Sequence, residues 1–508
     1  MDRATPNRIS SGYGSLKQAS SSDLAVKPAE CLTPKRVTPF LTYLVVVVTL
    51  GPLQFGYHLG ELNAPEKVIT CKANQLPKRD GYDAFGLPQC ILMNSAQWGM
   101  IQSLFTIGGL IGALFSGSMA TKYGRVFVIR WLTFFLVAGP MAEALAGKIW
   151  IMAWGRAISG LGAGAATVVC PIYISEVSPA EKRGLFGAFT QVQINLGILG
   201  SQILGYFLSK GSKWRWILGT AGFIAALTFV GLMLAPETPQ WLAANNRPQM
   251  AGGILRRIRG RDTDIREEME DWAMSGEAEE ESLLEPPRGP RPHKEPGKSF
   301  LEVIRIRKYR KAVIAVTVTM MAQQLCGINA VVMYSVAILE KIMPKQAALI
   351  TVIVSAVNVL ITLFSSPLAD KIGRKPCLLS SISGMGLASI LLAVGLAKDI
   401  RVLAIIGIVL FVCGFSVGLG PVPFILASEL VGPDAVGATS SWALAGNWLS
   451  TFLVAQFFPL LIAALPQGRV WWIFAVLAGA FGLFVGFFVP ESKGKANADE
   501  VWGRVRQT

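Results

Sequence analysis

The stretch PIYISEVSPAEKRG, residues 171–184, ends one long apolar run, and the related stretch PVPFILASELVGPDAVG, residues 421–437, ends another. Two more motif pairs occur in the same order: YGR (123–125) with IGR (372–374), and PETPQWL (236–242) with PESKG (490–494). Motifs that repeat at corresponding positions indicate two copies of one structural unit. The sequence therefore predicts a duplicated fold.

Apolar runs that are long enough to cross a membrane lie between these motifs. Of the 508 residues, 52% are hydrophobic and 16% are charged, and the mean hydropathy is +0.48. About 20 apolar residues in a helix span a ~30 Å hydrocarbon core. The runs predict twelve such helices, which begin near residues 40, 95, 126, 149, 184, 214, 312, 346, 376, 402, 437 and 470. The expected fold class is an all-α polytopic membrane protein.

Polar segments divide the chain into five expected parts. These are a disordered cytosolic tail (1–39), a six-helix bundle (40–236), a cytosolic linker with short helices and a disordered Pro-rich part (237–311), a second six-helix bundle (312–490) and a cytosolic tail (491–508). Two six-helix repeats with polar groups near the membrane midplane are typical of carriers that work by alternating access.

The chain is basic, with 47 Lys and Arg against 32 Asp and Glu. An excess of Lys and Arg is also what the cytosolic loops of a membrane protein carry, so it does not indicate nucleic-acid binding here. If both termini are cytosolic, most of the basic residues lie on the cytosolic side. We therefore expect both termini in the cytosol.

In their order and spacing, these motifs resemble those of the sugar porters of the major facilitator superfamily, which include the facilitative glucose transporters and their proton-coupled relatives. The resemblance covers about residues 40 to 495, and further motifs that carry it are QFGYHLGELNAP (54–65), WGRAISGLGAG (154–164), QQLCGINAVVMYS (323–335) and GNWLSTF (446–452). It implies a twelve-helix major facilitator fold and alternating-access transport of a monosaccharide, a hexose and most of all glucose. The N-terminal motif and the loops also resemble a fungal vacuolar branch of hexose transporters.

Other functions fit the sequence less well. It shows no nucleophile–base set, metal-ligand cluster or phosphate loop, so we expect neither an enzyme nor a cofactor or metal site. A carrier for another polyol such as inositol, or a transporter-like sugar sensor, is the alternative function.

Amide side chains recur within the apolar helices. A buried amide costs free energy unless it is paired, and an amide both donates and accepts, as a sugar hydroxyl does. The resemblance implies that the sugar contacts Gln191, Gln323, Gln324, Asn329 and Asn358. Asn447, Trp448 and Phe424 complete the predicted substrate site, although Phe424 stands where glucose transporters usually have tryptophan.

His58 and Glu61 interrupt the first apolar run, one helical turn apart. A carboxylate near the bilayer midplane costs about 2.5–3.5 kcal/mol, so Glu61 should face a cavity or a cation. In proton-coupled sugar porters an aspartate occupies the position of His58, close to an arginine that matches Arg156, whereas the uniporters have asparagine there. His58, Glu61 and Arg156 are therefore the candidate proton-coupling residues, and both proton symport and uniport stay open.

Charged residues at the cytosolic ends of the helices resemble a family gate that ties the two halves together when the pore faces outward. These residues are Arg125, Glu176, Arg183, Asp370, Arg374 and Glu429. Such pairs can act as a latch because they must break as the halves rock apart.

Two further signals concern location and partners. Cys71 and Cys90 fall in the loop after the first span, on the non-cytosolic side where disulfides persist, so we expect a bridge. Glu279, Leu283 and Leu284 fit an acidic dileucine signal read by sorting adaptors, which favours a vacuolar or lysosome-like membrane, with the plasma membrane second. The expected partners of this monomer are a sugar, a proton in the case of symport, the lipid bilayer and a sorting adaptor.

Overall fold

The computed structural model describes residues 37–72, 81, 86–179, 182–260, 265, 266, 268, 269, 302–340, 343–365, 368–432, 435–495 and 498–504. Residues 37–508 form one compact unit, to which everything below belongs. The predicted sorting residues Glu279, Leu283 and Leu284 lie outside the described residues.

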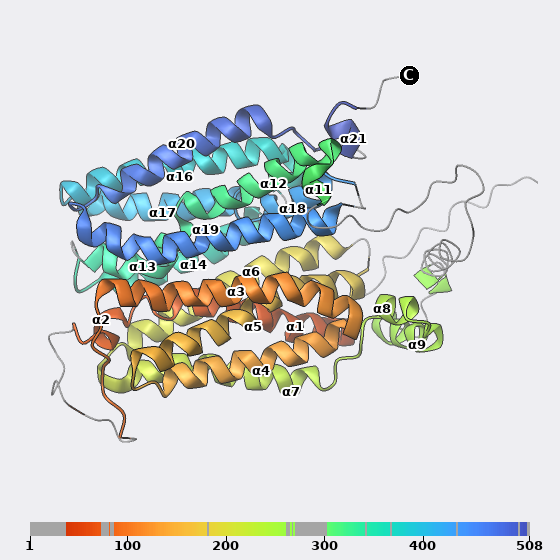
Figure 1. Ribbon diagram of the computed structural model, residues 1–508, viewed down its shortest axis with the longest axis horizontal. Helices are drawn as coiled ribbons and strands as arrows, with labels where there is room; N and C mark the ends of the chain where they lie inside the picture. The colour runs from red at the N-terminus through yellow and green to blue at the C-terminus, as the bar shows by residue number, and fades with distance from the viewer. Residues whose placement is uncertain are drawn as a thin grey trace, which may run out of the picture. The chain divides into compact units, whose positions relative to one another are not determined.

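The expected helices are present in the expected order (Figure 1). The first repeat contains α1 (Pro39–Gly60), α3 (Ser95–Tyr123), α4 (Arg125–Ala144), α5 (Ile149–Val177), α6 (Arg183–Leu208) and α7 (Trp214–Leu232). The second repeat contains α12 (Arg307–Leu325), α13 (Ile328–Glu340), α14 (Ala347–Ser365), α16 (Arg374–Ala397), α17 (Arg401–Val417), α18 (Val422–Glu429), α19 (Val436–Ala464) and α20 (Val470–Phe488). The prediction of an all-α polytopic membrane fold is confirmed.

Eleven helical segments within the described residues are long and apolar enough to cross a membrane, with α12 and α13 counted as one span and α17 and α18 as another. The remaining predicted span is α6, which carries the amides of Gln191, Gln193, Asn195 and Gln202. These side chains lower its hydropathy, and they also make it a candidate lining of a polar site.

Two of the spans in the second repeat are broken, and both breaks have a local cause. Gly327 adopts φ +105° between α12 and α13, a conformation that L side chains rarely adopt. Between α17 and α18, Pro421 has no backbone N–H to donate, and Gly418 lies against the carbonyl of Cys377, where a Cβ would clash. Broken helices leave backbone carbonyls without helical partners, which side chains can then use.

Each repeat packs mainly within itself, and a few helices join the two. In the first repeat α3 packs on α5, α1 on α6 and α4 on α7, and in the second α16 packs on α17 and α20, and α12 on α19. Contacts of α3 with α19, and of α6 with α14, connect the repeats. These two contact pairs place α3, α6, α14 and α19 along the boundary between the repeats.

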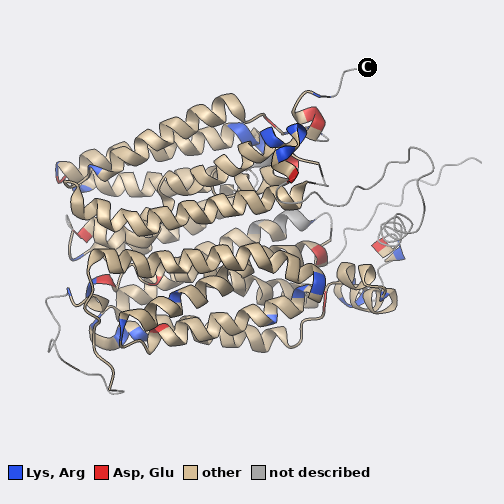
Figure 2. Cartoon of the chain, viewed as in Figure 1, with Lys and Arg blue, Asp and Glu red and all other residues tan. Residues whose placement is uncertain are grey.

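The two ends of the helices differ. The end that we call the linker side carries α8 (Pro239–Ala244), α9 (Pro248–Arg259) and α21 (Ala498–Val501), and the opposite end, the disulfide side, carries α2 (Glu66–Ile69) (Figure 1). Charged residues gather mostly at these two ends, and the middle of the helices is largely uncharged (Figure 2). This distribution fits helices that cross a membrane.

The repeated motifs form the same structure twice on the linker side. In the first repeat the Glu237 carboxylate accepts hydrogen bonds from the backbone N–H groups of Arg125 (2.9 Å) and Val126 (3.0 Å), at the start of α4. In the second, Glu491 accepts from Arg374 (3.0 Å) and Lys375 (3.0 Å), at the start of α16. A carboxylate is stabilised at a helix N-terminus, where orphan N–H groups point outward. In each repeat, the glutamate of the second motif (PET or PES) therefore caps the helix that begins at the arginine of the first motif (YGR or IGR).

The middle residue of both the YGR and the IGR motif is a glycine because the backbone before each capped helix has a positive φ. Gly124 and Gly373 have φ values of +105° and +116°. A Cβ on Gly373 would lie 2.8 Å from Oε2 of Glu491 and would push the capping carboxylate away.

We expect Gly373→Ala to lower the melting temperature of the detergent-solubilised protein, by an amount that corresponds to at least about 1 kcal/mol, because alanine is strained at this φ and the cap is displaced. Gly479→Ala is the matched control, since Gly479 lies inside α20 and a Cβ there meets nothing within 4 Å. Equal melting temperatures for Gly373→Ala and the unchanged protein would contradict this explanation of the motif.

Candidate functional site

Five polar side chains of the second repeat form one buried network. Asn447 donates to Gln323 (2.6 Å), Gln324 donates to Asn447 (3.3 Å), and Asn329 donates to Gln324 (2.7 Å) and Thr451 (3.4 Å). The break at Gly327 turns the chain so that Asn329 can reach back to Gln324. The structure therefore brings together four of the amides that the sequence assigned to the site.

The break between α17 and α18 contributes backbone acceptors to this network. The amide nitrogen of Gln323 donates to the carbonyls of Leu419 (2.7 Å) and Gly420 (3.0 Å). Phe424, which the sequence also placed in the site, lies on α18 and is half exposed.

A second group of amides joins the repeats. Asn195 of α6 donates to Thr362 of α14 (2.7 Å), and Asn358 of α14 donates to Asn195 (3.4 Å). Asn358 also accepts from Ser416 of α17 (2.7 Å). Gln191 is half-buried one turn before Asn195 and donates to it at 3.5 Å. The position of Asn195 at the boundary between the repeats was not predicted from the sequence.

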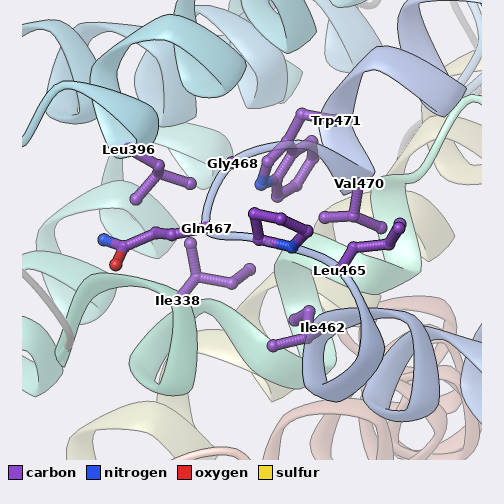
Figure 3. Close-up of a pocket in the computed structure, with 9 residues that line it drawn as sticks. Ile338, Leu396, Ile462, Leu465, Gln467, Gly468, Val470 and Trp471 are labelled. Carbon is purple, nitrogen blue, oxygen red and sulfur yellow. The ribbon is translucent and has the colours of Figure 1, made fainter.

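A pocket adjoins this second group of amides. It lies between α6 and the helices of the second repeat, and its polar lining comes from Gln202, Ser335, Thr351, Ser355 and Asn358. Hydroxyl and amide groups on an otherwise aliphatic wall are what a neutral polyol requires. Another pocket, shown in Figure 3, lies within the second repeat near Ile338, Leu396 and Trp471, and its wall is mostly apolar.

Aromatic rings fill the boundary beside the amides. Trp448 of α19 is 4% exposed, and its ring lies edge-on to Phe55 of α1, with ring centroids 5.6 Å apart. A Cβ on Gly109 of α3 would clash with the same indole ring. The contact between α3 and α19 therefore depends on this glycine.

The first repeat holds a buried group of charges. Nη1 of Arg156 lies 2.5 Å from Oε1 of Glu61, and the same oxygen lies 2.8 Å from Nδ1 of His58. Nη2 of Arg156 donates to Gln102 (3.1 Å) and to the backbone carbonyl of His58 (3.1 Å). The side chains of His58, Glu61 and Arg156 are 0% exposed. The structure brings the three candidate proton-coupling residues into direct contact.

Glu143 of α4 belongs to the same group and was missed from the sequence. Its Oε2 lies 3.7 Å from Nη1 of Arg156, and its Oε1 accepts a hydrogen bond from Ser159 (2.5 Å). The signal was available, because a carboxylate inside an apolar run is costly without a partner. The sequence does not show that α4 and α1 place two glutamates around one arginine.

The predicted gate residues form ion pairs within each repeat. Nη2 of Arg125 lies 2.7 Å from Glu176, and Nη2 of Arg374 lies 2.8 Å from Glu429. Hydroxyls from the PET and PES motifs add to both pairs, since Thr238 donates to Glu176 (2.6 Å) and Ser492 donates to Glu429 (2.5 Å). The side chains of Arg183 and Asp370 lie outside the described residues, so a tie between the repeats through them stays a prediction.

On the disulfide side, Asn63 joins the repeats directly. Its amide nitrogen donates to the Val332 carbonyl (2.9 Å) and to Ser335 (2.8 Å), and its oxygen accepts from the Val336 N–H (3.1 Å). Asn63 stands in the ELNAP part of the motif, but its role was not predicted. It closes the boundary between α1 and α13 at this end.

An ion pair lies beside this contact. Lys67 of α2 lies 2.8 Å from Glu340 of α13. Burial raises the pKa of the adjacent Glu66 to about 7, with Glu340 adding to the rise and Lys72 and Lys67 opposing it. The charge of this contact region therefore changes near neutral pH. Cys71 and Cys90, the expected pair, form a disulfide next to α2, with a Cα–Cα distance of 5.3 Å.

Comparison with known proteins identifies the family of this chain. The family described as "Sugar (and other) transporter" matches residues 44–501. The chain belongs to this sugar transporter family. Membership makes it a monosaccharide carrier of the alternating-access type.

Individual relatives of this sugar transporter agree over nearly their full length. A probable metabolite transport protein of Saccharomyces cerevisiae is 33% identical, over 92% of this chain and 96% of the relative. The vacuolar protein sorting-associated protein 73 of the same yeast is 32% identical, over 90% and 95%. Human facilitated glucose transporter member 3 is 31% identical, over 92% of each.

A solved structure confirms the fold of the sugar transporter. The xylose transporter XylE from E. coli, in a partially occluded inward open conformation, has a TM-score of 0.73 at 23% identity, and the match covers 90% of this chain and 100% of XylE. The predicted major facilitator fold is therefore confirmed.

Proposed function

We propose that this transporter moves its sugar together with a proton, which binds within the buried charge group of the first repeat that contains His58, Glu61 and Arg156. The observation that carries the proposal is the contact of one buried carboxylate oxygen with both an imidazole nitrogen and a guanidinium nitrogen. An imidazole can bind and release a proton, which an amide side chain at this position could not do. Uptake or loss of a proton there changes the strength of the ion pair between Glu61, at the end of α1, and Arg156 of α5.

The position of this group on α1 suggests how proton binding reaches the sugar. Glu61 and Asn63 lie two residues apart at the end of α1, and Asn63 holds α13 of the second repeat. A change in the bond between Glu61 and Arg156 therefore acts on the helix end that closes the disulfide side. An ion pair and a neighbouring contact on one rigid element can be coupled in this way.

In proteoliposomes, we expect an imposed pH gradient to drive sugar accumulation, by about tenfold for a gradient of one pH unit if one proton moves with each sugar. His58→Asn should abolish accumulation because it removes the imidazole that contacts Glu61 and can exchange a proton within the buried charge group. Uptake by the unchanged protein that is indifferent to the gradient would exclude symport and leave uniport.

For the substrate we propose a hexose, with glucose first, bound among the network of amides in the second repeat. Gln323, Gln324, Asn329 and Asn447 satisfy one another in the structure, and sugar hydroxyls can replace these bonds one for one because they also donate and accept. The rings beside Trp448 supply an apolar face for the sugar. Relatives named as glucose transporters support this choice, and inositol is the alternative of similar size.

Asn329→Ala should raise the half-saturating sugar concentration by about tenfold, because one paired hydrogen bond to the sugar is lost. Asn245→Ala is the control, since Asn245 is an exposed amide at the end of α8. Competition among glucose, fructose, galactose, xylose and inositol in the same vesicles identifies the substrate. A panel in which inositol competes best would contradict the hexose proposal.

We propose a vacuolar or lysosome-like membrane as the location, with the linker side in the cytosol and the disulfide side in the lumen, and a monomer without enzymatic activity as the working form. The name of one yeast relative supports the vacuole. The disulfide supports the lumenal side, because disulfides persist outside the cytosol. The dileucine residues in the cytosolic linker would recruit a sorting adaptor.

Changing Leu283 and Leu284 together to alanine should redirect a fluorescent fusion from the vacuolar membrane to the plasma membrane, because the adaptor no longer binds. Changing Pro286 and Pro287 to alanine, just after the signal, is the control. Unchanged vacuolar fluorescence in the dileucine variant would show that the signal does not act.

A further inference from the structure

Glu143 is a second carboxylate in the buried charge group, and it is not one of the candidate coupling residues named above. It is 0% exposed on α4. One of its oxygens accepts from Ser159 of α5, and the other lies 3.7 Å from the guanidinium of Arg156.

Two glycines leave the space between α4 and α5 that the Glu143 carboxyl and the Ser159 hydroxyl occupy. A Cβ on Gly155 of α5 would lie 2.6 Å from Cγ of Glu143, and a Cβ on Gly139 of α4 would clash with the Ser159 hydroxyl. Larger residues at either position would separate α4 from α5. The close approach of the two helices therefore places the Glu143 carboxyl next to the Ser159 hydroxyl and the Arg156 guanidinium.

The charges of the group do not balance without a proton. Glu61 and Glu143 carry two negative charges when ionised, whereas Arg156 carries one positive charge and His58 carries none when neutral. The other polar side chains that face Glu143 or Arg156, Gln102 of α3 and Ser159 of α5, are neutral. A buried uncompensated charge is strongly unfavourable, so one bound proton stabilises the group.

The unsatisfied hydrogen-bonding atoms of the group also support a bound proton. Among the described residues, five of its buried polar atoms have no hydrogen-bond partner: Nε2 of His58, Oε2 of Glu61, Oε2 of Glu143, Nε of Arg156 and Nε2 of Gln102. Buried polar groups are normally satisfied, so these donors and acceptors are available to a bound proton or a water molecule.

We propose that Glu143 is the carboxyl that holds the transported proton, and that the proton decides how Arg156 is shared. A proton from water on one side of the membrane forms an O–H bond with Oε2 of Glu143, and the carboxyl becomes neutral. Arg156 then pairs with Glu61 alone, which ties α5 to α1. When the O–H bond breaks and the proton leaves to water, the carboxylate attracts Arg156, which is then shared between α1 and α4. Glu143 is thus a proton-binding residue of the transport cycle.

This inference rests on the proposed proton symport, and proteoliposomes test it apart from that proposal. Glu143→Gln mimics the protonated carboxyl permanently. We expect it to lose accumulation driven by a pH gradient, a drop of about tenfold for a gradient of one pH unit. Sugar counterflow without a gradient should continue at a reduced rate and lose its dependence on pH. The matched control is Asp399→Asn, which removes an exposed carboxylate from the loop after α16.

The outcomes separate the two proposals. If the unchanged protein accumulates sugar and His58→Asn does not, while Glu143→Gln accumulates sugar normally, the role of Glu143 is wrong and the symport stands. If the unchanged protein ignores the gradient, both proposals fail.

A second variant covers the case in which Glu143→Gln does not fold, as judged by its melting temperature. Ser159→Ala keeps the carboxyl and removes the hydroxyl that donates to it. Because that hydroxyl favours the ionised carboxylate, its loss should shift the pH profile of uptake toward higher pH. An unchanged profile would overturn the proposal.

Discussion

A guanidinium in the middle of a helical bundle has no bulk water to pair with, so the helices around Arg156 must supply its partners. They do so from three directions, with Glu61 at the end of α1, Gln102 on α3 and Glu143 on α4. This requirement brings four helices of the first repeat to one point. The contact of Asn63 with α13 follows from it, because Asn63 lies on the same chain segment as Glu61.

The polar interior of the second repeat contains neutral amide side chains. Its two broken spans release backbone carbonyls and let amides from α12, α13 and α19 bond to one another. Amides carry no net charge, so they can exchange partners with a sugar at little electrostatic cost. Among the described residues the two interiors therefore differ, since the first repeat holds the buried ion pairs and the second holds the network of four mutually bonded amides. Asn195 connects the two interiors through Asn358 and Thr362.

The sequence predicted the fold well because apolar runs and repeated motifs are local signals. Most of the residues predicted for the site also lie together, since the four amides of the second repeat contact one another and so do the three candidate coupling residues. Their roles stay predictions. What the sequence could not show are partners set by packing. Glu237 and Glu491 were visible as parts of motifs, but their place at helix N-termini depends on the chain returning across the bundle. Glu143 and Asn63 were missed for the same reason, because each acts through a helix far away in sequence.

The bond between Cys71 and Cys90 closes a loop of chain on one face, with a sequence separation of 19. Lys72 lies inside that loop and is exposed, so trypsin applied to this face has a cleavage site there. A cut at this point would leave the two fragments joined through sulfur. The nicked chain would migrate intact in a denaturing gel until a thiol reagent separates its N-terminal piece, so limited digestion of sealed vesicles reports which face is exposed.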